Sequence, residues 1–315
     1  MGATGGVDAR GPRAAGVRAA GGVTSLGRVS SLRAEPVTPA LAFHGEGPVW
    51  DAAAGTLHWV DMLAGDLLSL DADGGVRRRH LATEVLAAVR PRMGGGLVLG
   101  VERGFALLDD GAERPRVLPP LWEDRGVRMN EGGCDARGRF WCGSMAYDQG
   151  EGRAALYRLD PDGTTTVALR GVTVSNGLVW TPDGGTAYYV DSATQRVDVF
   201  TVDPRGELTD RRPHVVVPEE VGTADGIALD TEGGLWVALY GGAAVHRYDA
   251  GGRLDAVVEL PVPNVTACAF GGPGLDQLFV TTSREGAVPG EQPQAGALFA
   301  CRPGVRGAPV HPFAG

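Results

Sequence analysis

The sequence contains no lysine, so all 29 of its basic residues are arginine. A bias of this kind is typical of GC-rich bacterial genomes. No run of about 18 consecutive apolar residues occurs, and we therefore expect no membrane-spanning helix. Long stretches with the apolar period of an α-helix are also missing, which argues against a helical fold.

Cysteine is scarce as well. The four cysteines, Cys134, Cys142, Cys268 and Cys301, form no Cys-x-x-Cys pair, and each lies in or beside an apolar run. We predict buried free thiols, which fits a cytoplasmic setting. The alternative is a disulfide between Cys134 and Cys142, which could face each other across a hairpin.

Acidic residues outnumber basic ones outside the N-terminal residues. The chain has a net charge of −9, and residues 1–36 hold five arginines against Asp8 and Glu35, which leaves −12 for the rest. An acidic body argues against nucleic acid as a partner. Residues 1–36 also lack the apolar core of a signal peptide. We interpret them as a disordered tail or an over-long predicted start, followed by one domain over residues 37–315.

The sequence is rich in glycine, with 50 residues, and contains 21 prolines. This composition favours many short strands joined by turns. The strands fall into six repeated units whose starts are spaced 41 to 49 residues apart. The units begin near Gly47, Ala88, Gly132, Gly177, Gly226 and Ala269.

Each unit repeats the same parts in the same order: an apolar strand, a tight Gly- or Asp-rich turn, and further strands separated by polar turns. The second strand carries a bulky residue at one shared position: Trp59, Val98, Trp141, Tyr189, Trp236 and Phe279. Asp-Gly turns suit antiparallel hairpins, and four-stranded sheets must stack to cover both faces. We therefore predict an all-β fold, a six-bladed β-propeller with four-stranded antiparallel blades. Two β-sandwiches would not explain the repeated bulky position.

The sequence indicates less clearly which strands close the ring. The last unit lacks a clear fourth strand. Either the segment APVHPF (residues 308–313) supplies it, or residues 37–43 pair into the last blade. We expect closure that uses residues from both ends of the chain.

Oxygen-bearing side chains stand before the first strand in four units: Glu46, Asn130, Asn176 and Asp225. A turn explains any single Asn-Gly or Asp-Gly pair. In a propeller, however, equivalent positions of the innermost strands converge at one mouth of the channel. Two carboxylates and two amides in this register predict a site for a hard divalent cation, for which calcium fits best and magnesium, manganese and zinc are alternatives.

No other catalytic set competes with this one. The histidines lack metal-binding spacing, and no GxSxG or P-loop pattern occurs. His44 could reach the mouth near Glu46, although a packing role is commoner for such a histidine. Asp61 and Asp191 end second strands, where they are interpreted as lid residues or as turn residues. Residues 284–294 are expected to border the mouth.

Several stretches resemble, in order, the senescence-marker-protein, gluconolactonase and regucalcin family of six-bladed propellers. They are GEGPVW, RMNEGGCDARGRFWCGSM, VSNGLVWTPDGGTAYYVDS, ADGIALDTEGGLWVALY and TACAFGG. The resemblance covers the chain from about residue 41 to its C-terminus. It implies that Glu46, Asn176 and Asp225 bind one divalent metal. The shared register adds Asn130 as a candidate fourth ligand, direct or through water.

The same resemblance implies the substrate contacts. The family motif Arg-x-Asn-Asp-Gly reads RMNEG here, which places sugar-lactone contacts on Arg128 and Asn130. The chain departs from the motif at Glu131, where aspartate is usual. An acidic substrate contact beyond the stretch GSM falls on Asp148, which is shorter than the usual glutamate.

The leading functional hypothesis is metal-dependent hydrolysis of a sugar lactone to the aldonic acid, with Asp225 also acting as the base toward water. Two alternatives stay open: a phosphotriesterase-like hydrolase, and a calcium-binding propeller without catalysis. The expected partner is a small sugar lactone, with neither nucleic acid nor membrane. The sequence leaves the preferred lactone, the native metal and the oligomeric state open.

Overall fold

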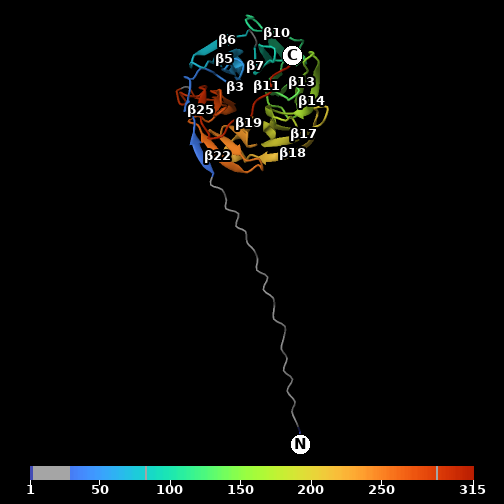
Figure 1. The fold of residues 1–315 in the computed structure, drawn as a ribbon, viewed down its shortest axis with the longest axis vertical. Helices are drawn as coiled ribbons and strands as arrows, with labels where there is room; N and C mark the ends of the chain where they lie inside the picture. Colours follow the sequence, from blue (N-terminus) through green and yellow to red (C-terminus); the bar gives the residue numbers. More distant parts are fainter. Residues whose placement is uncertain (3–28, 82–83, 289) are drawn as a thin grey trace.

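The computed structural model describes residues 1–2, 29–81, 84–288 and 290–315. Six antiparallel sheets are arranged around a central axis, with β3, β7, β11 and β19 near the middle and β6, β10, β14, β18 and β22 toward the rim (Figure 1). The protein is a six-bladed β-propeller, as the repeated units predict. The predicted tail lies largely in residues 3–28, outside the described residues.

The first three blades follow the chain from the innermost strand outward. Blade 1 contains β3 (Gly45–Asp51), β4 (Thr56–Asp61), β5 (Asp66–Leu70) and β6 (Val76–His80). Blade 2 contains β7 (Leu86–Pro91), β8 (Leu97–Val101), β9 (Gly104–Leu108) and β10 (Arg116–Val117). Blade 3 contains β11 (Val127–Cys134), β12 (Phe140–Ala146), β13 (Ala154–Leu159) and β14 (Thr165–Val172).

The next two blades are built in the same order. Blade 4 contains β15 (Ser175–Trp180), β16 (Thr186–Asp191), β17 (Arg196–Val202) and β18 (Leu208–Val216). Blade 5 contains β19 (Thr223–Leu229), β20 (Leu235–Tyr240), β21 (Ala244–Tyr248) and β22 (Leu254–Glu259). Three short 3-10 helices, η1 (Met62–Ala64), η2 (Ser192–Thr194) and η3 (Glu219–Val221), lie in the connections.

Blade 6 closes the ring with strands from both ends of the chain. Its inner strands are β23 (Val265–Gly271), β24 (Gln277–Thr282) and β25 (Phe299–Cys301), and its fourth strand is β2 (Glu35–Pro36), which pairs antiparallel with β25. Strand β1 (Ser30–Arg33) adds a fifth, parallel strand outside β22. Closure from both ends is therefore correct, but the strands begin at residue 30, inside the segment predicted as tail.

The segment APVHPF does not form the fourth strand of blade 6. It runs across the ring instead, because Gly307 bridges Asp230 of blade 5 and Phe313 bridges Arg92 of blade 2. Figure 1 shows the chain ending between blades 2 and 3, near β10 and β13. The backbone groups of this segment thus pair with two blades on the opposite sides of the channel rather than with an outer edge.

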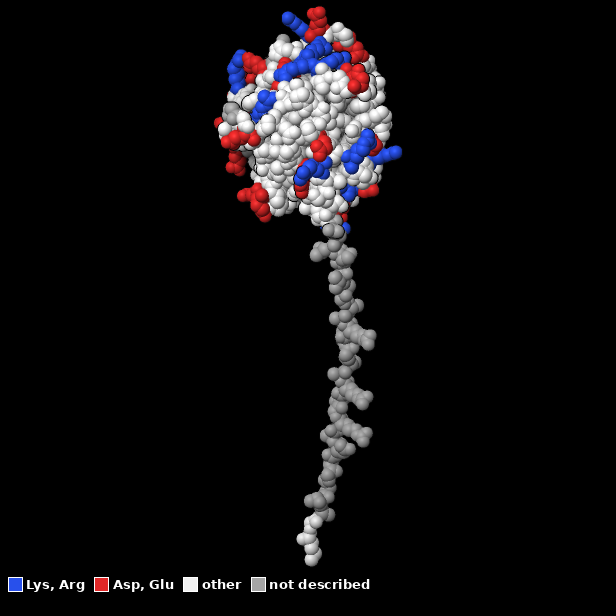
Figure 2. Space-filling model, turned by 90° about the vertical axis from the view of Figure 1, so that its left-hand side faces the viewer, with Lys and Arg blue, Asp and Glu red and all other residues white. Residues whose placement is uncertain are grey.

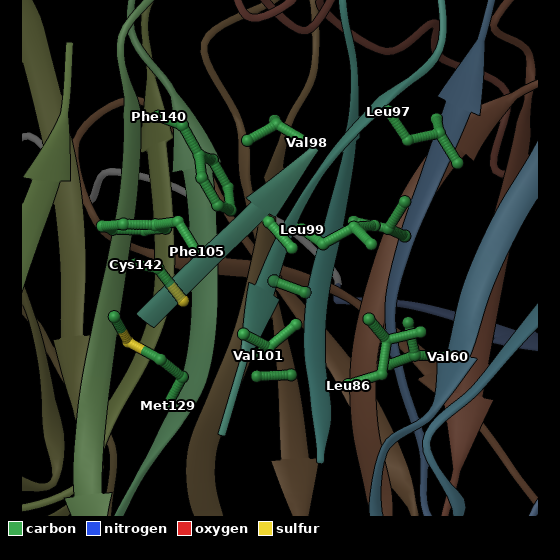
Figure 3. Close-up of a cluster of buried hydrophobic side chains, with 14 of the residues drawn as sticks. Val60, Leu86, Leu97, Val98, Leu99, Val101, Phe105, Met129, Phe140 and Cys142 are labelled. Carbon is green, nitrogen blue, oxygen red and sulfur yellow. The ribbon is translucent and has the colours of Figure 1, made fainter. Parts of the chain in front are cut away.

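The core lies between neighbouring blades. Figure 3 shows Val60 of blade 1, Leu99 of blade 2 and Phe140 of blade 3 in one buried cluster, and Phe105 meets Phe140 edge to face with ring centroids 5.6 Å apart. The six residues of the predicted bulky position are all buried, which fits packing of each blade face on the next.

The four cysteines are free, so the disulfide between Cys134 and Cys142 does not form. Among the described residues, no helix is long and apolar enough to cross a membrane. On the face shown in Figure 2, acidic and basic side chains of the described residues are interspersed around a large uncharged area.

Candidate functional site

A cavity of about 500 Å³ opens at one end of the central channel. Its lining includes all four oxygen-bearing positions predicted from the repeats: Glu46, Asn130, Asn176 and Asp225. Arg128 lines the same cavity. Residues separated by up to 179 positions in the sequence (46 to 225) are therefore gathered in one place, because each stands at the axial end of its own blade.

A β-bulge at the start of every inner strand explains how these side chains reach the axis. In all six blades the pairing between first and second strand slips by one residue at this point, for example between Ser175 and Leu178 of β15 and between Ala224 and Ile227 of β19. A bulge redirects a side chain out of the regular alternation. Asn176 and Asp225 lie within these bulges, so their polar groups face the channel.

The corresponding bulges of the other two blades contain no carboxylate or carboxamide. Blade 2 has Ala87 there, and blade 6 has Thr266, whose hydroxyl donates to the carbonyl of Gly45 at 2.6 Å. From this position, only blades 1, 3, 4 and 5 therefore place a carboxylate or carboxamide side chain in the cavity. The site is asymmetric although the six backbone positions are equivalent.

A chain of hydrogen bonds fixes the two amides. Arg128 Nη1 donates to Asn130 Oδ1 at 2.6 Å, and Asn130 Nδ2 donates to Asn176 Oδ1 at 3.0 Å. Asn176 Nδ2 in turn donates to Ser192 Oγ at 2.8 Å. These bonds hold the Asn176 amide with its oxygen toward Asn130 and its nitrogen toward blade 4. Asn130 therefore orients the predicted ligand Asn176 as well as lining the cavity itself.

The two carboxylates of the site are deeply buried. Glu46 is 3 % exposed and Asp225 is 6 % exposed. Glu46 Oε2 accepts the backbone N–H of Gly47 at 2.9 Å, whereas Asp225 Oδ1 has no hydrogen-bond partner within the described part of the chain. An unpaired buried carboxylate oxygen is costly, and a bound cation would satisfy it.

The pKa values of the two carboxyl groups indicate that a nearby positive charge would stabilise their ionised forms. Burial raises the pKa of Asp225 well above its ordinary value, and the neighbouring charges of Glu46 and Glu131 raise it further, while Arg128 opposes the shift. Burial and Glu131 likewise raise the pKa of Glu46 to about 8. Burial lowers the pKa of His44 to about 4, so this histidine is neutral near pH 7.

The donor set fits a hard divalent cation through its chemistry. Glu46, Asn176 and Asp225 offer only oxygen atoms, which calcium and magnesium prefer. Within the described ranges, no three His, Cys, Asp or Glu side chains group together as a metal site. A cation held at this point would therefore need the Asn176 amide together with the two carboxylates.

Glu131 lies on the channel side of β11 but faces a different space. It lines a second, small cavity of about 50 Å³ farther along the channel, together with Arg90 and His311. Burial raises the pKa of Glu131 to about 7, and Arg90 opposes the shift. The C-terminal segment (residues 308–311) covers this cavity. The motif departure at Glu131 thus falls behind the site, where it adds negative charge beneath Glu46 and Asp225.

Asp148 does not reach the cavity. Its carboxylate pairs with Arg153 at 2.6 Å and its side chain is 66 % exposed, whereas the next residue, Gln149, lines the cavity. Gln149 has a left-handed backbone, with φ of 54°. The turn therefore presents the amide of Gln149, rather than the carboxylate of Asp148, at the mouth.

Asp61 and Asp191 have the same structural task in blades 1 and 4. Asp61 accepts the backbone N–H groups of Phe43 and His44, each at 3.0 Å. Asp191 accepts those of Thr173 and Val174 at 3.1 and 2.9 Å. They anchor the backbone just before an inner strand, which favours the turn interpretation over a lid.

Sequence reasoning missed several lining residues at strand ends and turns: Ser192, Gln195, Thr223 and Tyr240. Glu285 also lines the cavity and lies in the segment 284–294, which the sequence predicts to border the mouth. The other four residues belong to no obvious motif. One signal was present: VDMLAG (residues 60–65) and VDSATQ (residues 190–195) occupy equivalent places in two units and mark a shared turn.

Known proteins share this architecture and sequence. The family described as "SMP-30/Gluconolactonase/LRE-like region" matches residues 44–284. Regucalcin from Sus scrofa is 35 % identical over 300 residues, which is 91 % of this chain and 100 % of that protein. A Bacillus subtilis protein named "Putative sugar lactone lactonase YvrE" is 33 % identical over 279 residues, covering 86 % of this chain and 95 % of that protein.

A solved structure of a related protein has the same fold. The calcium-binding protein regucalcin from Agrobacterium tumefaciens superimposes with a TM-score of 0.84 at 28 % identity, covering 92 % of this chain and 100 % of that one. The family match spans more than half of the sequence and includes the strands that carry Glu46, Asn176 and Asp225. The chain belongs to the SMP-30/gluconolactonase/LRE-like family.

Proposed function

We propose that the protein hydrolyses a sugar lactone to its open aldonic acid, using one divalent cation, with calcium the first choice. The observation that supports this most strongly is the shared cavity. The oxygen ligands Glu46, Asn176 and Asp225 line the same space as Arg128 and Asn130, which are suited to bind sugar hydroxyls. A cation site and a polyol-binding group are thus within reach of one small molecule.

Glu46, Asn176 and Asp225 would hold the cation. When bound, it would polarise the lactone carbonyl and stabilise negative charge on the carbonyl oxygen. In this scheme Asp225 accepts a proton from the water that attacks the carbonyl carbon, since its buried Oδ1 has no hydrogen-bond partner among the described residues. The ester C–O bond then breaks, and the proton passes to the ring oxygen, which leaves as a hydroxyl group.

Arg128 and Asn130 position the substrate in this scheme. Arg128 is held by its hydrogen bond to Asn130 Oδ1 and lies over the ring of Tyr147, 5.7 Å from the ring centroid. A guanidinium fixed on two sides loses little freedom when it binds a hydroxyl or carbonyl oxygen. The names of the relatives support the same assignment, since one refers to a sugar lactone lactonase and another to a calcium-binding protein.

A role in bacterial carbohydrate metabolism inside the cytoplasm follows as part of the proposal. Three of the four free thiols are buried, and burial raises the pKa of the thiols of Cys134, Cys142 and Cys268. Unpaired cysteines fit a reducing compartment. A neutral small molecule is the proposed partner, and the acidic body gives no support for nucleic-acid binding.

The test is turnover of D-glucono-1,5-lactone by wild type and by Asp225→Ala. Metal-stripped protein is resupplied in turn with calcium, magnesium, manganese and zinc. We expect wild type to lose activity on stripping and to recover it with at least one cation, and Asp225→Ala to lose at least about 100-fold in kcat. Asp183→Asn, an exposed aspartate outside the cavity, is the matched control.

Three outcomes would overturn parts of the proposal. Full activity of Asp225→Ala removes Asp225 from the mechanism. Tight calcium binding without turnover of any lactone favours a calcium-binding propeller without catalysis. Turnover of an organophosphate triester but of no lactone, assayed in parallel, favours a phosphotriesterase.

A further inference from the structure

The turn after the second strand of blade 4 is a structural copy of the turn in blade 1. In blade 1 the first backbone N–H of η1 donates to His44 O at 2.9 Å, and in blade 4 that of η2 donates to Val174 O at 2.9 Å. In both, the residue that ends the helix has a left-handed backbone and its N–H donates to the first helical carbonyl. The two turns therefore impose the same backbone requirement.

The two turns differ in the residue at this left-handed position. Blade 1 has Gly65, with φ of 68°, and blade 4 has Gln195, with φ of 51°. Glycine adopts this conformation freely, whereas a residue with a Cβ atom is strained in it. Blade 4 thus has a glutamine at a position where glycine would form the same turn without strain.

The side chain of Gln195 lines the catalytic cavity, whereas Gly65 does not. Its Oε1 is buried and has no hydrogen-bond partner among the described residues. An unpaired buried amide oxygen is a second unfavourable feature at the same residue. Backbone strain and an unsatisfied acceptor persist together mainly where a ligand uses them.

Ser192, at the start of the same turn, ties Gln195 to the proposed cation site. Ser192 Oγ accepts from Asn176 Nδ2 at 2.8 Å and donates to the carbonyl of Ala224 at 2.6 Å, next to Asp225. The backbone of Gln195 is fixed to Ser192 at 3.1 Å and accepts from Val217 at 2.9 Å. The amide of Gln195 is therefore carried on a support that is rigid relative to Asn176 and Asp225.

We propose that Gln195 is a specificity-determining residue that binds a hydroxyl group of the substrate away from the ester that reacts. An amide offers both a donor and an acceptor, so it pairs with a hydroxyl that can donate to Oε1. The substrate class is a polyhydroxylated lactone, discriminated from lactones without hydroxyl groups. This inference rests on the proposed lactonase function.

The test compares wild type with Gln195→Gly, which installs the residue that blade 1 already uses. Activity is measured on D-glucono-1,5-lactone and on δ-valerolactone, which has the same ring without hydroxyl groups. We expect kcat/KM to fall roughly tenfold or more for the polyhydroxylated lactone and to change less than about twofold for δ-valerolactone. The Tm should not fall, because glycine removes the left-handed strain.

Asp210→Gly is the matched control. Asp210 also has a left-handed backbone, with φ of 52°, and it is exposed on β18 outside the cavity. We expect it to keep both activities and to match Gln195→Gly in Tm. An equal loss on both lactones, or no loss on either, overturns the inference for Gln195.

Failure of the proposed function gives a different pattern, since wild type would then hydrolyse neither lactone. In that case calorimetric titration with D-glucitol decides the inference without turnover. Binding that weakens at least about tenfold in Gln195→Gly supports it. Equal affinity of the two proteins, or no binding to wild type, overturns it.

Discussion

At the scale of single residues, the cavity is lined by two asparagines whose amides are hydrogen-bonded at both ends. The chain contains only three asparagines, and two of them, Asn130 and Asn176, line the cavity. Asn130 Oδ1 accepts from Arg128 on its own strand, and Asn130 Nδ2 donates to Ser175 O and Asn176 Oδ1. Asn176 Nδ2 donates to Ser192 Oγ in the following turn. These amides face the cavity because each lies in a β-bulge, and not because of its residue type alone.

Burial keeps two histidines, His44 and His58, neutral by lowering the pKa of each ring. His58 is 8 % exposed, and its Nδ1 lies 2.8 Å from Ser69 Oγ. Burial lowers the pKa of His58 below its ordinary value of 6.5, with Asp51, Arg77 and Asp71 contributing smaller effects of both signs. The folded protein therefore resists protonation of this ring.

A pH dependence of stability follows for His58. Below pH 6.5 the unfolded chain binds a proton that folded His58 does not bind. The free energy of unfolding therefore decreases as the pH is lowered from 6.5 to the pKa of His58 in the folded protein. His58→Gln lacks this group, so its stability deficit at pH 7.5 should shrink at pH 5, by up to about 1.4 kcal/mol per pH unit within that window. Urea unfolding at both pH values measures it, and a deficit that grows toward pH 5 contradicts it.

At the scale of elements, the inner strands pack so closely that glycine is required beside the ligands. A Cβ atom on Gly226 of β19 would lie 2.7 Å from Cα of Ala267 on β23. On Gly177 of β15 it would lie 2.7 Å from the backbone nitrogen of Ile227. The glycines after Asn176 and Asp225 thus let adjacent blades approach closely at the axis.

Gly226→Ala should therefore be strongly destabilising. We expect a loss of about 2–4 kcal/mol in the free energy of unfolding, because backbone has to move at the axis. Gly94→Ala is the control, since nothing lies within 4 Å of an added Cβ there, and it should change stability by less than about 0.5 kcal/mol. Equal Tm values of the two variants would show that the inner strands are not tightly packed at this point.

Sequence reasoning predicted the elements well and the turns poorly, for a physical reason. The inner strands repeat six times, so their polar starts could be compared with one another, and Glu46, Asn176 and Asp225 do line one cavity. Turns such as the one holding Asp148 and Gln149 occur once, and a single left-handed residue decides which side chain faces the cavity. Propensity does not determine that choice, because strain at Gln149 and Gln195 opposes it.

At the scale of the whole molecule, ring closure depends on few residues. Only Glu35 and Pro36 form the ladder with β25, and Thr38 adds a bond from the N–H of Leu298 to its Oγ1 at 3.1 Å. The sequence showed that closure uses both ends but not which residues take part, since two-residue strands have no periodicity to read. Such a short strand is defined by the strand with which it pairs and not by its own sequence pattern.

Truncation tests the closure and the predicted tail together. A chain that starts at Val29 keeps β1 and β2, and we expect its Tm to equal that of the full chain. A chain that starts at Pro39 loses both strands and should lose at least about 5 °C in Tm, because blades 5 and 6 are left with unpaired edges. Equal Tm values for both truncations would mean that the ring closes without β2.

The pairing of Glu35 with Ala300 also sets the order of events during biosynthesis. A ribosome releases residues one after another, so the partner of this early strand emerges 265 residues (300 − 35) after it. Until then the nascent protein is an open arc with two unmatched edges. The ring therefore cannot close before Ala300 has been translated.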